Sequence, residues 1–185
     1  MKVAVFGGSF NPPHVAHVLA CSLVLSVQDV DRVLVVPTYK HPFAKPLAPY
    51  DDRVRMCGLA FASMPAVEVS RVEEALGGES RTLRTLEHLS GSRPDWKLRL
   101  VVGADILPEA PRWFGFEAIA RLAPLIVLAR AGVEADGVGP PLLPEVSSTR
   151  VRSAIEIGAW DEVEKVVPRR VLDYVREKGL YGAAA

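Results

Sequence analysis

Short apolar runs alternate along this chain with longer segments of helical character, and this alternation constrains the fold more than any other feature. The runs occupy residues 1–6, 32–36, 67–70, 98–102 and 125–128, and a last short strand is expected at residues 142–146. The expected helices lie at residues 14–27, 51–63, 82–89, 116–122, 148–157 and 168–178. Several runs contain four consecutive apolar residues, at 3–6, 33–36 and 125–128, which is typical of parallel strands buried on both faces. The sequence therefore predicts an α/β fold, a Rossmann-like doubly wound parallel sheet with helices on both faces and a C-terminal helical appendage.

Length and composition set the expected organisation. The chain has 185 residues, of which 49% are hydrophobic and 24% charged. That is ordinary globular composition at a length typical of about one domain. No internal repeat or domain boundary is visible, so residues 1–185 are expected to form one domain with a helical tail from about residue 148.

The net charge and the cysteine content limit the classes of binding partner and the cellular compartments that the sequence favours. The 22 basic and 22 acidic residues give zero net charge, which disfavours a protein that coats a nucleic acid polymer. No apolar run approaches the ~20 residues of a membrane helix. Cys21 and Cys57 form no CxxC motif, which fits a reducing compartment. We expect a cytoplasmic protein with no membrane partner, and the sequence leaves a homo-oligomer open.

The loop after the first expected strand has the composition of an anion-binding site. It reads Gly7-Gly8-Ser9-Phe10-Asn11-Pro12-Pro13-His14-Val15-Ala16-His17. Glycines let the backbone approach a ligand, and N–H groups at a helix start point toward an anion. The loop lacks the GK[ST] of a Walker A motif and the GxGxxG of a dinucleotide fold.

His14 and His17 stand three residues apart, which places both imidazoles on one face of the first helical turn. Three interpretations are open: packing at the helix end, a zinc-binding pair, and donation of N–H to phosphate oxygens. No third zinc ligand stands nearby at a suitable spacing. The pair therefore favours phosphate binding.

A second candidate anion site opens a later helix, with the residues Ser147-Ser148-Thr149-Arg150-Val151-Arg152. Serines at a helix start are commonly caps. Arginines in a first turn, however, oppose the helix macrodipole. A polyphosphate over this helix end would remove that conflict, because it would accept from N–H groups, hydroxyls and a guanidinium together.

Both segments resemble signature motifs of the nucleotidyltransferase superfamily of adenylyl- and cytidylyltransferases. The early loop is similar to GGxFDPxHxGH, in which His14 and His17 match the two histidines. Asn11 and Ala16 replace the usual aspartate and glycine. The later segment is similar to ISSTxIR, which in that superfamily grips the β- and γ-phosphates of ATP. Its matched residues are Ser148, Thr149 and Arg152.

The middle of the chain narrows the resemblance to one family. Residues 102–105, followed by Trp113, are similar to the GAD…W pattern of nicotinate-nucleotide adenylyltransferases. The resemblance implies that Gly103 and Asp105 lie against the ATP adenosine and that Trp113 stacks on a pyridine ring. Packing of Trp113 in an aromatic cluster with Phe116 is the alternative.

Two segments differ from the sequences that are usual in that family. Many members have SYTxDTL where this chain places Arg81 and Arg84, and we assign these two arginines no role. The loop that includes Lys40 and His41, also without assigned roles, departs from PPHK. Lys45 in the same loop is expected to assist the ATP phosphates, with a solvated loop charge as the alternative.

The resemblance implies a set of site residues. The expected catalytic residues are His14, His17, Arg152 and Lys45. The expected ATP-binding residues are Gly7, Gly8, Ser9, Phe10, His14, His17, Gly103, Asp105, Ser148, Thr149 and Arg152. The expected pyridine-nucleotide residues are Asn11, Thr82, Thr85 and Trp113. Mg²⁺ is expected on the ATP triphosphate, held by phosphate and water rather than by a metal site of the protein.

The implied reaction is adenylyl transfer from ATP to nicotinate mononucleotide, which gives deamido-NAD and pyrophosphate in NAD biosynthesis. Alternatives are another phosphate acceptor, such as nicotinamide mononucleotide or phosphopantetheine, and a non-catalytic nucleotide sensor. A nucleotide-binding redox module is disfavoured, because the second expected strand ends without the acidic residue that would hold a ribose.

Overall fold

The molecule is built on a five-stranded, wholly parallel sheet with the order β3-β2-β1-β4-β5. A computed structural model describes residues 1–41, 46–107, 113–129, 131 and 143–183. The strands are β1 (Lys2–Gly8), β2 (Arg32–Pro37), β3 (Val67–Val69), β4 (Lys97–Gly103) and β5 (Leu125–Leu128). Each coincides with an expected apolar run to within a few residues, and the α/β prediction is confirmed.

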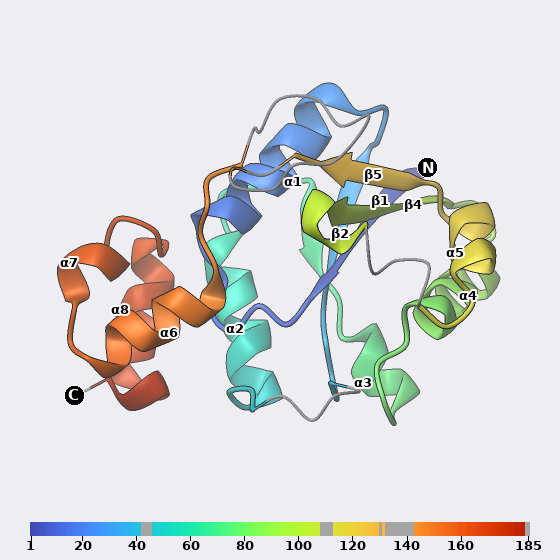
Figure 1. Cartoon of the computed structure of the whole chain (residues 1–185). Helices are drawn as coiled ribbons and strands as arrows, with labels where there is room; N and C mark the ends of the chain where they lie inside the picture. Colours follow the sequence, from blue (N-terminus) through green and yellow to red (C-terminus); the bar gives the residue numbers. More distant parts are fainter. Residues whose placement is uncertain (42–45, 108–112, 130, 132–142, 184–185) are drawn as a thin grey trace.

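Helices connect the strands and form the C-terminal tail (Figure 1). They are α1 (Val15–Val27), α2 (Tyr50–Ala60), α3 (Val72–Leu76), α4 (Thr82–Ser92), α5 (Phe116–Leu122), α6 (Ser148–Glu156), α7 (Trp160–Val163) and α8 (Arg169–Glu177). The 3₁₀ turns are η1 (Ala104–Ile106) and η3 (Leu180–Gly182). The short helices α3 and α7 were not expected individually, because one turn of helix is too short to show an apolar period.

Two hydrophobic cores cover the two faces of the sheet. Along β1, Ala4 packs into one core, while Val3 and Val5 pack into the other, as the two-residue period of a strand requires. The first core takes buried residues of α1, α2, α6 and α8, and the second takes those of α3, α4 and α5. Figure 1 shows the same division, with the C-terminal helices beside α2. Helices therefore cover both faces, as the sequence predicts.

The strand order places a topological switch point between β1 and β4. From β1 the chain proceeds through β2 to β3 on one side, and then crosses to β4 and β5 on the other. In open parallel sheets, ligands bind beside such a point, at the carboxyl ends of the strands. Gly8 and Gly103, the last residues of β1 and β4, stand at that edge.

The C-terminal tail packs against α2. Val171, Leu172 and Val175 of α8 are buried in the same core as Met56 and Cys57 of α2. The Tyr174 hydroxyl of α8 also donates to Asp52 Oδ1 of α2 at 2.7 Å. Within the described residues, no helix is long and apolar enough to cross a membrane.

Candidate active site

The two histidines of the first loop stand together at the start of α1. His14 is the N-cap residue and His17 belongs to the first turn. Their rings stack with centroids 3.8 Å apart, and the His14 backbone N–H donates to His17 Nδ1 at 3.1 Å. A ring nitrogen that accepts carries no hydrogen, so the neutral His17 ring presents its N–H at Nε2. His17 thus has a fixed donor, as phosphate binding requires.

Aromatic packing holds the His17 ring in place. Its centroid lies 4.9 Å from that of Phe10 and 6.0 Å from that of Phe6. Phe10 is fully buried and has a φ of +46°, a conformation that bulky residues rarely adopt. A Cβ added at Gly8 would come within 3.3 Å of the Phe10 ring, so glycine makes room for this arrangement. The loop is therefore built to support His17.

The two motifs, about 135 residues apart in the sequence, are joined by direct hydrogen bonds. The Arg152 guanidinium donates from Nη1 to the Asn11 carbonyl at 2.8 Å. The Ser148 hydroxyl donates to the Pro12 carbonyl, also at 2.8 Å. Arg152 Nη2 contacts the Thr149 hydroxyl at 3.4 Å. The start of α6 thus lies against the loop that leads into His14, and Ser147 is its N-cap, through an acceptor bond from the Arg150 N–H.

Asn11 is the most enclosed polar side chain of the loop, at 1% exposure. Its Oδ1 accepts from the Ala48 N–H at 3.0 Å and from the Tyr181 hydroxyl at 2.9 Å. Its Nδ2 is buried and has no hydrogen-bond partner among the described residues. Burial raises the pKa of the Tyr181 hydroxyl, while nearby Arg152 and Arg53 lower it; the net rise keeps the phenol protonated as a donor.

Arg53 of α2 supports the same loop, although neither sequence motif includes this residue. It is 1% exposed, and it donates from Nη1 to the Ser9 carbonyl at 3.0 Å and from Nε to the Ala48 carbonyl at 2.9 Å. Burial lowers the pKa of its guanidinium. The sequence did contain a signal, because the spacing of Arg53, Met56 and Cys57 places an arginine on the apolar face of the helix.

The residues expected to meet the adenosine lie at the end of β4. Gly103 ends the strand, and a Cβ there would meet the Asp105 carboxylate, so a larger residue would require the Asp105 side chain to turn away. Asp105 is exposed. Around Gly7, on β1, no atom would lie within 4 Å of an added Cβ, so its surroundings are open. Trp113 is half-buried and packs against the second core, as Leu83 and Leu107 also do.

The segment expected to hold the pyridine nucleotide adjoins the end of β2. Ser80 N–H donates to the Lys40 carbonyl at 2.9 Å, and Thr82 begins α4. Thr85 is 4% exposed, and its hydroxyl lies 3.2 Å from Glu73 Oε1. Glu73 Oε2 also accepts from the Tyr39 N–H at 3.0 Å and from the Ser80 hydroxyl. The role of Thr85 in this structure is therefore to fix Glu73, and its contact with a nucleotide stays a prediction.

The two arginines of that segment have partners within the protein. Arg84 donates to the carbonyls of Leu76 and Gly77, where α3 ends, at 2.7 Å each. Arg81 pairs with Glu79 at 2.9 Å. In this structure, therefore, both arginines order the loop around α4. Lys45 lies outside the described residues.

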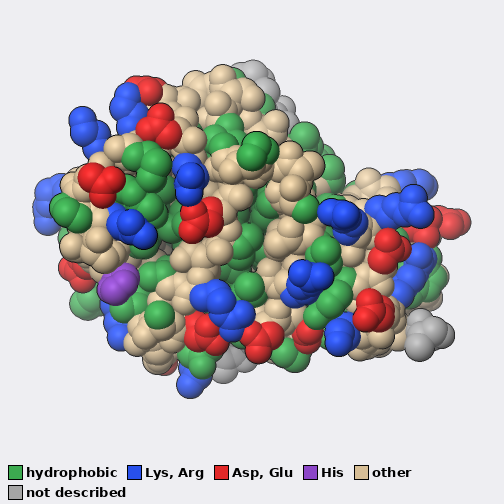
Figure 2. All heavy atoms as spheres, turned by 180° about the vertical axis from the view of Figure 1, so that it is seen from behind, with side chains coloured by type: hydrophobic (Ala, Val, Ile, Leu, Met, Phe, Trp, Pro, Cys, Tyr) green, Lys and Arg blue, Asp and Glu red, His purple; other side chains and the backbone are tan. Residues whose placement is uncertain are grey.

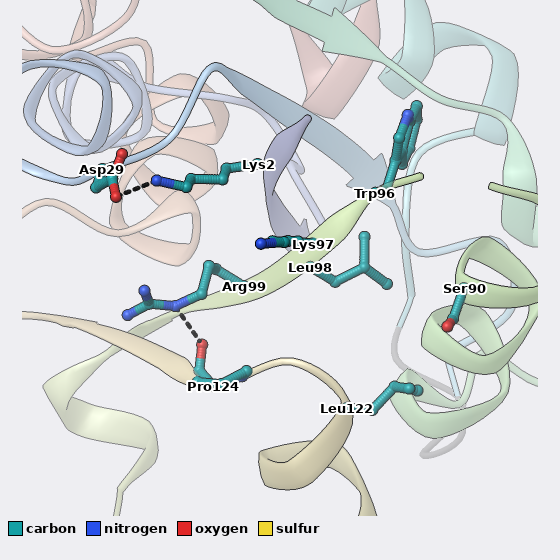
Figure 3. A pocket seen from close by; sticks show the side chains of 9 residues that line it. All are labelled: Lys2, Asp29, Ser90, Trp96, Lys97, Leu98, Arg99, Leu122 and Pro124. Atoms are coloured by element: carbon teal, nitrogen blue, oxygen red, sulfur yellow. Dashed lines mark hydrogen bonds and ion pairs between the residues drawn. The ribbon is translucent and has the colours of Figure 1, made fainter. Parts of the chain in front are cut away.

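A shallow cavity of about 360 Å³ lies at the opposite end of the sheet (Figure 3). It is lined by Lys2, Trp96, Lys97 and Arg99, among others, at the amino ends of β1 and β4. Figure 3 shows Lys2 bonded to Asp29, and Arg99 to the Pro124 carbonyl. The cavity is therefore separate from the histidine loop.

The surface in Figure 2 has no extended area of one charge among the described side chains drawn there; Lys and Arg alternate with Asp and Glu. Among the described residues, no group of three or more His, Cys, Asp or Glu side chains is placed to hold a metal ion. Among the described residues, Arg152 and Arg53 bring positive charge to the candidate site, and Asp105 brings a carboxylate.

Comparison with known proteins identifies the family of this chain. The model of a family described as cytidylyltransferase-like matches residues 5–154. A protein of Anaeromyxobacter dehalogenans named "Probable nicotinate-nucleotide adenylyltransferase" is 44% identical over 97% of this chain and 96% of its own length. One of the same name from Thermus thermophilus is 35% identical over 98% of this chain and all of its own. The Plasmodium falciparum nicotinic acid mononucleotide adenylyltransferase, solved with NaAD, has the same fold, with a TM-score of 0.89 at 17% identity over 99% of this chain and 98% of that one.

Proposed function

Since the chain belongs to the nicotinate-nucleotide adenylyltransferases of the cytidylyltransferase-like family, we propose that it transfers the adenylyl group of ATP to nicotinate mononucleotide. The products are deamido-NAD and pyrophosphate, and the step belongs to NAD biosynthesis. The observation that carries this function is the pair of bonds from Arg152 and Ser148 to the loop before His14. They unite two phosphate-binding motifs into one site beside the switch point.

The reaction needs alignment and charge stabilisation more than proton transfer. An oxygen of the acceptor's 5′-phosphate forms a bond to the α-phosphorus of ATP, and the bond from that phosphorus to the bridging oxygen of the β-phosphate breaks. The attacking group is already an anion, so no general base is required. His17 Nε2–H donates to the α-phosphate oxygens, where charge changes during transfer. His14, stacked on His17, donates its backbone N–H to fix that ring.

The start of α6 receives the departing pyrophosphate. Ser148 and Thr149 open the helix, where N–H groups point toward an anion. The Arg152 guanidinium has five N–H donors, and two of its nitrogens make the described bonds to Asn11 and Thr149. The remaining donors serve the β- and γ-phosphates, with Lys45 as a further cation. Gly7, Gly8, Ser9 and Phe10 form the backbone wall of the ATP site.

Magnesium enters as part of the substrate, MgATP. Asp105 is the exposed carboxylate at the end of β4, and no other described acidic group joins it in a three-residue metal cluster. Mg²⁺ commonly keeps several waters and binds substrate phosphates. We expect the triphosphate to carry this ion into the site, where it would neutralise charge on the leaving pyrophosphate.

The function is tested by the release of pyrophosphate from MgATP with three acceptors in parallel. We expect turnover with nicotinate mononucleotide and much lower kcat/KM with nicotinamide mononucleotide and phosphopantetheine. Preference for another acceptor would reassign the substrate. No turnover with any acceptor, in a chain that still binds ATP, would indicate a nucleotide sensor instead.

Replacing Arg152 by alanine is expected to raise the KM for ATP about tenfold or more, because one charge-assisted contact contributes about 1.5–3 kcal/mol. It also removes the bond to the Asn11 carbonyl. Initial rates at varied MgATP measure the effect. R150A is the matched control, since Arg150 is an exposed arginine of the same helix turn. Equal KM values for ATP in the two variants would contradict the pyrophosphate role of Arg152.

Replacing Trp113 by alanine is expected to raise the KM for the mononucleotide about tenfold, because stacking on the pyridine ring contributes about 0.5–1.5 kcal/mol beyond area. The KM for ATP should change little. W113F keeps an aromatic ring and should recover most of the loss. If W113A lowers only the thermal stability, Trp113 is a packing residue of the second core.

A further inference from the structure

A single carboxylate, that of Glu73, joins three segments of the chain. Its Oε2 accepts from the Tyr39 backbone N–H at 3.0 Å and from the Ser80 hydroxyl. Its Oε1 lies 3.2 Å from the Thr85 hydroxyl. Tyr39 follows β2, Ser80 precedes α4, and Thr85 belongs to α4. Glu73, on the short helix α3, therefore connects the end of β2 with the start of α4.

The Ser80 hydroxyl is the centre of this junction. Its oxygen accepts from the N–H groups of Tyr39 and Lys40, at 2.9 and 3.3 Å. A hydroxyl has one proton and two lone pairs, so Ser80 is left with its proton to donate, and Glu73 accepts it. The Ser80 backbone N–H also donates to the Lys40 carbonyl at 2.9 Å. The junction therefore needs a hydrogen-bond acceptor at position 73.

The junction lies at the edge of the sheet where ligands of open parallel sheets bind. The Thr38 N–H donates to the Gly8 carbonyl at 2.9 Å, which holds the residues after β2 next to the end of β1. The predicted adenosine contacts, Gly103 and Asp105, follow β4, on the other side of β1. The junction is therefore on the β2 side of this edge.

The first turn of α4 also packs against the turn that carries Trp113. A Cβ added at Gly115 would come within 2.5 Å of Leu83 Cδ2, so the Leu83 side chain lies directly on the Gly115 backbone. The Trp113 carbonyl accepts from the Phe116 N–H at 3.2 Å, which closes the turn around Gly115. Leu83 and Trp113 pack against the same core. The place of this first turn of α4 therefore affects Trp113 as well as Thr82.

We propose that Glu73 is a positioning residue, whose carboxylate fixes the first turn of α4 against the end of β2 and thereby places Thr82 and Trp113 for the mononucleotide substrate. The inference rests on the proposed function, in which these two residues contact the mononucleotide. Glu73 acts through Ser80 and Thr85 rather than by touching the substrate. Its partners are an N–H group and two hydroxyls, so the position requires hydrogen bonding rather than negative charge.

The first test compares E73A with E74A. Both remove a carboxylate from α3, but Glu74 bonds to Arg71, at 2.6 Å, rather than to the residues around α4. E73A is expected to raise the KM for nicotinate mononucleotide about tenfold, the scale of one hydrogen bond to a charged group. The KM for ATP should stay within about twofold, and E74A should change neither KM. A fall in Tm of E73A without separation of its two KM values would overturn the inference.

The second test is E73Q, which keeps hydrogen bonding but removes the charge. The amide oxygen can accept from Tyr39 and Ser80, as Oε2 does. The amide nitrogen can donate to the Thr85 hydroxyl, whose own proton can go to the Arg81 carbonyl 3.3 Å away. We expect E73Q to have a KM for the mononucleotide within about twofold of the wild type. A KM as high as that of E73A would overturn the inference, because position 73 would then act through its charge.

S80A breaks the same junction with a smaller change, and it carries the test should E73A fold poorly. It removes the hydroxyl that connects Glu73 with the backbone after β2. Alone, it should raise the KM for the mononucleotide about fivefold, the scale of one neutral hydrogen bond. In the E73A background it should add less than about twofold, since the link is already broken. Full additivity would overturn the inference, because Ser80 would then act independently of Glu73.

Wild-type turnover is measured first. Its absence with nicotinate mononucleotide would overturn the proposed function and this inference with it. Normal turnover with the same KM for the mononucleotide in wild type, E73A and E74A would overturn this inference alone.

Discussion

Replacing His17 by alanine is expected to lower kcat about 100-fold or more, the scale seen when a single donor to developing charge is removed. The structure holds this ring on three sides: the His14 N–H binds its Nδ1, His14 stacks on it, and Phe10 packs against it. A donor held in this way needs no reorganisation during adenylyl transfer. Removing it should therefore lower the rate of the chemical step. The measurement is single-turnover formation of deamido-NAD with both substrates saturating.

Two variants separate the donor from its packing. H17Q keeps an N–H group on a side chain of similar reach, and it should retain more activity than H17A. H88A removes an exposed histidine of α4, far along the chain from both motifs, and should leave kcat unchanged. A folded H17A variant with the wild-type single-turnover rate would remove His17 from the mechanism.

The sequence predicts the sheet well because its signal is local. The run Leu100-Val101-Val102, for example, is apolar and is followed directly by Gly103, so the same few residues indicate a buried strand and its end. The same holds for the two phosphate motifs, each of which combines a helix start with anion-binding residue types. That the two motifs meet is confirmed by the bonds of Arg152 and Ser148 to the first loop.

The hydrogen bonds that hold the site in place are harder to predict from the sequence, because they join segments that are far apart along the chain. No local pattern connects Tyr181 to Asn11, or Arg53 to Ser9. Thr85 illustrates the same limit, since its burial against Glu73 depends on how α3 and α4 pack. The expected strand at residues 142–146 also depended on packing; the described part forms only a bridge in which Leu143 bonds to Ala129 and Ala131.

Replacing Arg53 by methionine is expected to lower the free energy of unfolding by about 2–4 kcal/mol, since the partly buried carbonyls of Ser9 and Ala48 each lose a donor at about 1–3 kcal/mol. In a chain of this size that corresponds to a fall in Tm of about 5–15 °C. Methionine fills a similar volume beside Met56 and Cys57, so the loss comes from the hydrogen bonds rather than from a cavity. Thermal unfolding followed by circular dichroism measures it.

Activity should fall along with stability, because the two carbonyls belong to Ser9 and Ala48, which flank the Asn11 contact in the site. R55M is the matched control: Arg55 is exposed on the same helix, and its loss should change neither Tm nor kcat/KM. R53K should not restore the wild type, since an ammonium cannot reproduce the planar fork that serves both carbonyls. An R53M variant as stable and active as R55M would show that the loop is held without Arg53, and that the remaining contacts of Asn11 suffice to position it.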